Sequence, residues 1–154
     1  MTFVKLNKSN IKKYKLNIFT EVIYQNFIYA KDISHLKHNK NEIYNLLTHD
    51  DTHINLYIVD NKIGGYLIGK IMKLNDGRNV YYVSYLYIGE TFRQKGLAKK
   101  FLSIVDKTVN ELNLDGVLLT CDTHNKKAHD LYLKNGFMPD MLLRNYTQFE
   151  ILFK

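Results

Sequence analysis

A basic turn between a strand-like run and a helix-like run is the segment of this chain best suited to bind an anion. The turn reads Arg93-Gln94-Lys95-Gly96-Leu97-Ala98-Lys99. Small residues at Gly96 and Ala98 let a ligand approach the backbone closely, and a helix start presents unpaired N–H groups and the positive end of its dipole. Arg93, Lys95 and Lys99 add positive charge. The turn therefore predicts a phosphate or pyrophosphate site.

The residue order of the turn excludes two common phosphate-binding motifs. It lacks the Gly-Lys-Ser/Thr of a P-loop and the Gly-x-Gly-x-x-Gly of dinucleotide-binding folds. Residues 80–88 before it are β-branched or aromatic almost throughout, and apolar residues recur at helical spacing after it. An ordinary strand–loop–helix connection with solvated lysines is the alternative interpretation of the turn alone.

A second group of residues is spaced to line one face of a short helix. Asn125 follows a strand-like run at residues 116–121 and is suited to cap a helix. Asn125, Ala128 and Tyr132 are three and four positions apart, so they share a face on which Ala128 leaves room for a ligand. Tyr132 would direct its hydroxyl to that ligand, whereas a core tyrosine is the alternative interpretation. Gly136 ends the helix.

Together the two blocks resemble the GNAT superfamily of N-acetyltransferases. Residues 93–98 are similar to its Arg/Gln-x-x-Gly-x-Gly/Ala acyl-CoA motif, and residues 125–137 to its Asn-x-x-Ala-x-x-x-Tyr-x-x-x-Gly-Phe block. The resemblance is strong over residues 81–137 and weak in the amino-terminal half. It implies an α/β (α+β) fold, with a mixed, mainly antiparallel sheet of about seven strands flanked by about four helices.

The resemblance also implies a chemistry, in which acetyl-CoA is the acetyl donor and a primary amine is the acceptor. The strand at residues 85–88 would splay away from the strand at residues 117–121, and the pantetheine arm would lie in the gap and pair with the backbone of Tyr87 and Ile88. A backbone amide near Leu86 or Tyr87 would polarise the thioester carbonyl. Tyr132 would be the general acid for the departing thiolate. The donor-binding residues implied in this way are Leu86, Tyr87, Ile88, Arg93, Gln94, Lys95, Gly96, Leu97, Ala98, Lys99, Asn125, Ala128 and Tyr132.

The general base is not identified by the sequence. Several family members carry a carboxylate on the strand before the turn, but residues 84–87 contain no acidic residue. Glu90, Asp122, His124 and Tyr85 acting through water remain as candidates. No dedicated base is needed if the amine enters neutral.

Two further groups have both a functional and a structural interpretation. Tyr81, Tyr82, Tyr85 and Tyr87 crowd one strand, where they either pack in the core or form an aromatic wall for the acceptor. The segment 49–53 carries a histidine at each end, but it reads as a loop, and two histidines four apart need a helix to face one metal ion. We therefore expect no metal site there.

The elements that must position these residues follow from hydrophobic periodicity. We expect strands over residues 2–6, 54–59, 63–74, 80–88 and 116–121, and one or two more within residues 141–153, broken near Asn145. We expect helices over residues 11–27, around residues 42–47, over residues 97–112 and over residues 126–135. This order, βααβββαβαββ, is the one that the resemblance implies.

Length and composition favour one domain over residues 1–154. The chain lacks a run of about eighteen apolar residues and the apolar core of a signal peptide, so we expect no membrane span and no secretion. One cysteine, Cys121, cannot form an internal disulfide, which is typical of a cytoplasmic protein, and it reads as an inert core thiol.

The net charge of +7 suits a polyanionic partner. Lysines are scattered and arginines scarce, so nucleic acid is disfavoured as a partner compared with the phosphates of CoA. The same charge argues against polycationic acceptors such as polyamines. A non-catalytic acyl-CoA-binding or regulatory module is the competing interpretation, and a homodimer is left open.

Overall fold

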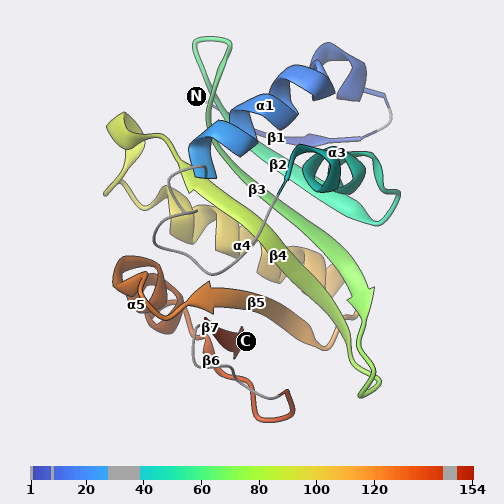
Figure 1. Ribbon diagram of the computed structural model, residues 1–154, viewed down its shortest axis with the longest axis vertical. Coiled ribbons are helices and arrows are strands. Elements are labelled where there is room, and N and C mark those ends of the chain that lie inside the picture. Colours follow the sequence, from blue (N-terminus) through green and yellow to red (C-terminus); the bar gives the residue numbers. More distant parts are fainter. Residues whose placement is uncertain (1, 8, 28–38, 144–148) are drawn as a thin grey trace.

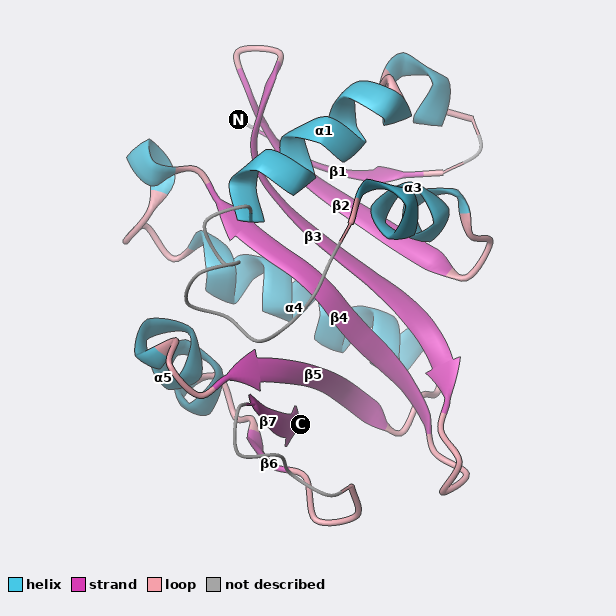
Figure 2. Ribbon diagram, in the orientation of Figure 1, coloured by secondary structure: helices cyan, strands magenta, loops and turns pink. Residues whose placement is uncertain are grey.

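The computed structural model describes residues 2–7, 9–27, 39–143 and 149–154. They form a seven-stranded sheet in the order β1-β2-β3-β4-β5-β7-β6 (Figure 2). The strands are β1 (Thr2–Leu6), β2 (Thr52–Val59), β3 (Lys62–Lys73), β4 (Asn79–Ile88), β5 (Gly116–Asp122), β6 (Met138–Pro139) and β7 (Phe149–Phe153). The α-helices are α1 (Leu16–Phe27), α3 (Lys40–Thr48), α4 (Leu97–Glu111) and α5 (Lys126–Lys134).

The predicted sheet is confirmed, since every neighbouring pair of strands is antiparallel except the central pair of β4 and β5. The hairpin between β2 and β3 turns at Asp60 and Asn61, whose φ angles of 49° and 62° suit a tight two-residue turn. None of the helices in the described part of the chain is long and apolar enough to span a bilayer.

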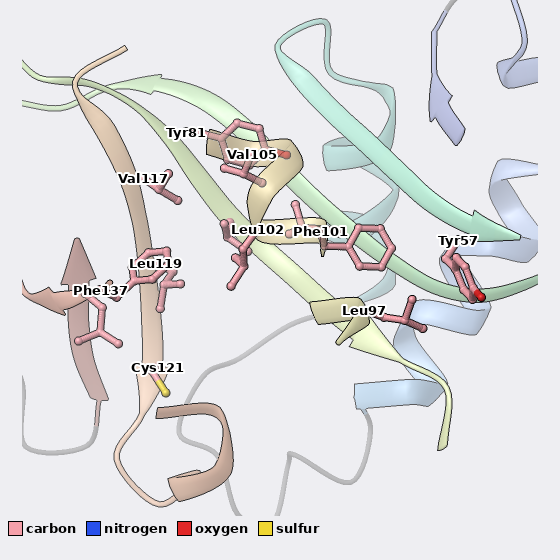
Figure 3. Close-up of a cluster of buried hydrophobic side chains, with 13 residues drawn as sticks. Tyr57, Tyr81, Leu97, Phe101, Leu102, Val105, Val117, Leu119, Cys121 and Phe137 are labelled. Atoms are coloured by element: carbon pink, nitrogen blue, oxygen red, sulfur yellow. The ribbon is translucent and has the colours of Figure 1, made fainter. Parts of the chain in front are cut away.

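The helices cover the two faces of the sheet separately (Figure 1). Helices α1 and α3 lie over one face, where Phe19, Ile23 and Ile43 are buried against β2 and β3. Helix α4 lies on the opposite face, and Figure 3 shows its Phe101 and Val105 among side chains of the sheet. Burying one side chain of this size stabilises a fold by about 2 kcal/mol, so both layers hold the sheet firmly.

A β-bulge at Ser84 decides which side chains of β4 reach each face. Ile68 pairs with Tyr85 and Gly69 pairs with Val83, which leaves Ser84 as the extra residue. Before the bulge Tyr81 and Val83 face α4, and after it Leu86 and Ile88 do. Tyr85 and Tyr87 therefore point to the α1–α3 face.

Gly69 makes room for the ring that lies beside the bulge. A Cβ atom at this position would lie 2.1 Å from Cε1 of Tyr81 and 2.8 Å from the carbonyl oxygen of Tyr82. Both distances are far below van der Waals contact. Only glycine fits here, and Tyr81 is completely buried as a result.

Strands β4 and β5 pair only at their beginnings. The parallel register runs from Val80 opposite Gly116 to Val83 opposite Leu119, and the strands pair no further. β5 instead continues to pair with β7 as far as Asp122. The two strands therefore diverge after Val83, as the family resemblance implies, and the far half of β4 keeps an unpaired edge.

Two predicted elements differ from the structure. Residues 11–27 do not form one helix, because a 3-10 turn at Ile11–Lys13 is separated from α1 by Tyr14 in extended conformation. The Asn10 side chain donates to the carbonyl of Lys5 and accepts from the backbone N–H of Asn7, which ties this turn to the end of β1. Of the final strands predicted within residues 141–153, β7 lies inside that range, whereas β6 lies before it at Met138–Pro139. The break predicted near Asn145 lies outside the described residues.

Candidate functional site

A cavity of about 860 Å³ opens where β4 and β5 diverge. The far half of β4 and the end of β5 form its walls, and the first turns of α4 and α5 border it. It also reaches Phe27 of α1 and Glu42 and Leu46 of α3, so it passes through the gap in the sheet to the opposite face. A cavity that crosses the sheet can hold two reactants that meet in the gap.

The anion-binding turn lies at the edge of this cavity. Gln94 and Gly96 have φ angles of 61° and 77°, so the backbone turns in the left-handed region just before α4 begins. Gly96 is the N-cap residue, and it has no side chain that could accept a hydrogen bond from the first turn of α4. The N–H groups at the start of α4 therefore remain available to an anion, as the sequence predicts.

The basic residues of the turn divide into two groups. Arg93 and Lys99 line the cavity. Nε of Arg93 donates a hydrogen bond to the carbonyl oxygen of Ile88 at 2.9 Å. This hydrogen bond holds the guanidinium 5.8 Å from the centre of the Tyr87 ring. Lys95 does not line the cavity, and its ammonium lies 5.9 Å from the centre of the Phe92 ring instead. A further cation, Lys127 in the first turn of α5, lines the cavity although it was not among the residues expected there.

The predicted helix face on α5 forms the adjoining wall. Asn125 caps α5, since its side-chain oxygen accepts from the backbone N–H of Ala128 at 3.2 Å. Asn125, Ala128 and Tyr132 all line the cavity, as do all the other residues that the resemblance implies for donor binding except Lys95. The structure thus brings this set together around one cavity, with Lys95 outside it.

Tyr132 lies between the cavity and the core on the α4 side of the sheet. Its ring packs against Phe137 with centroids 5.5 Å apart. Burial raises the pKa of the Tyr132 hydroxyl well above its ordinary value, and the nearby Cys121 raises it further. The phenol is therefore protonated throughout the neutral range, which is the form that can donate a proton.

Cys121 is buried in β5, as predicted, and it also lines the cavity. Burial raises the pKa of its thiol to about 11, with smaller contributions from Glu150 and Asp122. At neutral pH the thiol is uncharged and is a poor nucleophile. Its place in the cavity wall was not predicted, because strand alternation alone does not show where two strands diverge.

The candidate bases are not all near the cavity. Glu90 and His124 are exposed and do not line it, whereas Asp122 and Tyr85 do. Asp122 is buried and accepts a hydrogen bond from the backbone N–H of His124 at 2.8 Å. Burial raises the pKa of Tyr85 to about 12, with further contributions from Glu42 and Tyr82.

The four tyrosines of β4 do not form one surface. Tyr81 is buried on the α4 face, which makes it a core residue. Tyr82, Tyr85 and Tyr87 are half-buried and line the cavity. The packing interpretation is thus correct for Tyr81, whereas the other three are placed to contact a ligand.

The histidines of the segment 49–53 do not share a helix face. His49 ends α3 and His53 lies in β2. In the part of the chain that the structure describes, no three His, Cys, Asp or Glu side chains gather closely enough to hold a metal ion.

Comparisons with known proteins agree with this geometry. The sequence model described as "Acetyltransferase (GNAT) family" matches residues 19–137, and no curated protein matches the chain. An aminoglycoside acetyltransferase from an uncultured soil metagenomic sample, solved with trehalose, is similar with a TM-score of 0.67 at 15% identity, over 96% of this chain and 95% of that one.

Two further solved structures are similar to the same degree. Arabidopsis thaliana NAA60 in complex with acetyl-CoA has a TM-score of 0.68 at 18% identity, over 99% of this chain and 97% of that one. Ribosomal-protein-alanine N-acetyltransferase from Brucella melitensis biovar Abortus 2308 has a TM-score of 0.68 at 16% identity, over 95% and 96%. At these identities the solved structures establish the fold.

Proposed function

Because this chain belongs to the GNAT acetyltransferase family, we propose that it transfers an acetyl group from acetyl-CoA to a primary amine of a small molecule or peptide. The membership makes it an acetyl-CoA-dependent acetyltransferase, and the amine acceptor is the proposed part. The observation that carries the proposal is the cavity that passes through the sheet. It joins the anion-binding turn on one side to an aromatic wall, formed by Tyr82, Tyr85 and Tyr87, on the other.

The donor would occupy the α4 and α5 side of the cavity. Backbone N–H groups from Gln94 to Ala98 would hold the pyrophosphate, with Arg93, Lys99 and Lys127 around it. The pantetheine arm would lie along the unpaired edge of β4 and hydrogen-bond to the backbone of Tyr87 and Ile88, as an added strand would. Asn125 and Ala128 would border it on the other side.

The reaction would be a direct attack in a complex of both substrates. The amine lone pair forms a bond to the thioester carbon, and a backbone amide near Leu86 or Tyr87 stabilises the negative oxygen. The C–S bond then breaks, and Tyr132 donates its proton to the departing thiolate. The enzyme contributes mainly by positioning the reactants.

The amine must lose one proton on attack and must arrive uncharged. Of the candidate bases, Asp122 and Tyr85 line the cavity, and either could pass the proton to water. A neutral amine needs neither of them before attack. The absence of a carboxylate on residues 84–87 favours a reaction in which the amine arrives neutral and no dedicated base removes a proton before attack.

Ligand-induced stabilisation followed by an activity assay tests the proposal. CoA and acetyl-CoA should each raise the melting temperature of the purified chain, because a ligand that binds only the folded state stabilises it. Thiol release from acetyl-CoA should then depend on an added amine and yield the N-acetylated product by mass spectrometry.

The competing interpretation as a non-catalytic acyl-CoA-binding module makes a different prediction. It rests on the same missing carboxylate, and it predicts stabilisation by both ligands without thiol release for any amine. No stabilisation by either ligand would contradict both functions.

A further inference from the structure

The side of the cavity that faces α1 and α3 has a composition unlike the donor side. Tyr82, Tyr85 and Tyr87 of β4 line it together with Phe27 of α1. The Phe27 ring lies 5.0 Å from the Tyr85 ring and 6.2 Å from the Tyr87 ring, centre to centre. Aromatic rings grouped in this way bind the apolar body of a ligand and attract a cation to their faces.

The aromatic wall formed by Tyr82, Tyr85 and Tyr87 is held in place by contacts with the neighbouring strands β3 and β5. Tyr87 stacks on the buried Tyr66 at 5.4 Å with an interplanar angle of 25°. Tyr82 is hydrogen-bonded to Thr120 of β5. A wall fixed in this way binds a ligand without first losing conformational freedom of its own.

Charge also differs between the two sides. Among the described residues that line the cavity, the cations Arg93, Lys99 and Lys127 all belong to the turn or to the first turns of α4 and α5. The carboxylates are Asp122 and Glu42. The cations therefore gather where the phosphates of CoA would bind, with Arg93 reaching the Tyr87 ring at 5.8 Å, and the carboxylate of Glu42 acts at the Tyr85 end of the aromatic wall.

Glu42 is the carboxylate that remains available to a ligand. Asp122 is buried and already accepts from the backbone of His124. Glu42 is exposed in the first turn of α3, and it makes no ion pair with another described residue. Its charge acts on Tyr85, since it contributes to the raised pKa of that hydroxyl. The carboxylate and the aromatic wall thus belong to one surface.

We infer that the acceptor is an amine that carries a second positive charge, and that this charge binds between Glu42 and the aromatic wall of Tyr82, Tyr85 and Tyr87. The inference rests on the proposed function and specifies its substrate class. The attacking nitrogen would lie in the gap between β4 and β5, uncharged, while the second ammonium stays charged throughout the reaction. An apolar chain between the two nitrogens would cover the rings.

Net charge alone leads to the opposite expectation, that polycationic acceptors are disfavoured. Charges farther away than the screening length of about 8 Å at physiological salt contribute little, so the nearest carboxylate decides. The scattered lysines of the surface set the net charge, whereas Glu42 sets the charge next to Tyr85, at the end of the aromatic wall away from Arg93 and Tyr87.

Three amines of equal chain length test the inference, since they differ only in the charge at the far end. They are hexamethylenediamine (cationic), hexylamine (uncharged) and aminocaproate (anionic). With the wild-type chain we expect kcat/KM for the diamine to exceed that for hexylamine about tenfold, with aminocaproate poorest. Glu42→Gln should reduce the preference for the diamine to about twofold, with KM for acetyl-CoA unchanged.

Matched variants distinguish the loss of the proposed cation site from the general effect of removing a carboxylate or a side chain. Glu111→Gln removes a carboxylate at the end of α4, outside the cavity, and should behave like the wild type. Tyr85→Phe keeps a ring and should retain most of the preference, whereas Tyr85→Leu should lose it. An equal rate for the three amines in the wild type, or an unchanged preference in Glu42→Gln, would overturn the inference.

Binding of the same amines to the CoA-loaded chain, measured by calorimetry, distinguishes this inference from the proposed function. Preferential binding of the diamine that Glu42→Gln abolishes, without thiol release for any amine, would keep the cation site and reject amine acetylation. Thiol release that does not depend on the charge of the far end would keep amine acetylation and reject the cation site.

Discussion

The hydroxyl oxygens of Tyr82 and Thr120 lie 2.8 Å apart and join β4 to β5 at the point where the two strands begin to diverge. The last paired residues of these strands are Val83 and Leu119, so this side-chain contact is the final link before the gap. It lies on the α1–α3 side and forms part of the cavity lining. The width of the gap at this end is therefore set by two side chains as well as by the backbone.

A double-mutant cycle measures this link. Tyr82→Phe and Thr120→Val each remove the hydrogen bond with little change of shape. Their effects on the free energy of unfolding in urea should be less than additive, with a coupling of about 1 kcal/mol. Strictly additive effects would mean that the two hydroxyls do not interact in solution.

Tyr132→Phe should lower kcat about a hundredfold and change the Kd of CoA by less than about threefold, because the hydroxyl would act only when the thiolate departs. Since the pKa of Tyr132 is raised, the phenol keeps its proton as pH rises, and kcat should show no alkaline loss near the usual tyrosine pKa of about 10. Steady-state kinetics against pH checks both points. Tyr44→Phe, at an exposed site on α3, is the control. Full activity of Tyr132→Phe would reject the assignment of the general acid.

Gly96→Ala tests the anion-binding turn. Gly96 has a φ of 77°, and a Cβ atom at this position would meet no other atom within 4 Å, so alanine would be strained by backbone conformation alone. This strain should cost about 1 kcal/mol of stability. The strained turn should also redirect its N–H groups and weaken CoA binding about tenfold.

Gly77→Ala provides the matched comparison, because Gly77 has a φ of 95°, equally open surroundings and a place in the β3–β4 turn outside the cavity. Denaturant unfolding should give similar losses of stability for the two variants. Calorimetry should show weaker CoA binding for Gly96→Ala alone. Equal CoA affinity in both variants would argue against the turn as the phosphate site.

Arg78→Met should destabilise the chain by about 3 kcal/mol, because it leaves a buried carboxylate without its partner. The Arg78 guanidinium donates to both carboxylate oxygens of Asp140, at 2.7 Å and 3.0 Å, and Asp140 is buried. Urea unfolding measures the loss. Lys107→Met, which removes a long exposed ion pair with Glu111, should have no measurable effect.

The same pair predicts a pH dependence. Its hydrogen bonds to Arg78 hold the pKa of Asp140 below the ordinary carboxyl value. The stabilisation is therefore complete above that value and is lost as pH falls through the depressed pKa. The difference in unfolding free energy between the wild type and Asp140→Asn should be largest near neutral pH and shrink in acid. A constant difference would contradict the linkage.

The rate at which Cys121 is alkylated should report whether acetyl-CoA occupies the cavity. With its pKa raised to about 11, the thiol should react slowly at neutral pH, and the rate should rise about tenfold per pH unit up to that value. Acetyl-CoA should slow the reaction further, since Cys121 lines the cavity. Mass spectrometry of the labelled peptide measures the rate. Protection would be absent if CoA bound elsewhere.

Local sequence patterns were sufficient to predict the turn before α4 and the cap of α5, which both border the cavity. The turn at residues 93–99 and the cap at Asn125 depend on residues close together in the chain, where backbone conformation and helix spacing can be read directly. The mainly antiparallel sheet and the divergence of β4 from β5 came from the family resemblance, and the order of the strands in the sheet was not predicted, because pairing between distant strands leaves no local pattern.

The features that were missed all depend on contacts between distant segments. The bulge at Ser84 lies opposite Ile68 and Gly69 of the neighbouring strand, and no pattern within β4 predicts it. Glu42 belongs to a short amphipathic helix, whose sequence does not show that it borders the same cavity as β4. The split of the predicted helix at residues 11–27 depends on side-chain contacts of Asn10 with the end of β1.

The bulge at Ser84 has a consequence for how this chain can change over evolutionary time. After the bulge, side chains at 85 and 87 face one half of the cavity and side chains at 86 and 88 face the other, so each half can be substituted without altering the other. If Ser84 instead took a regular place opposite Ile68, without a bulge, Tyr85 and Tyr87 would lie beneath α4 and Leu86 and Ile88 would face α1 and α3. Point substitutions in this strand can thus vary one half of the cavity at a time, and the extra residue at position 84 is what assigns each set of side chains to its half.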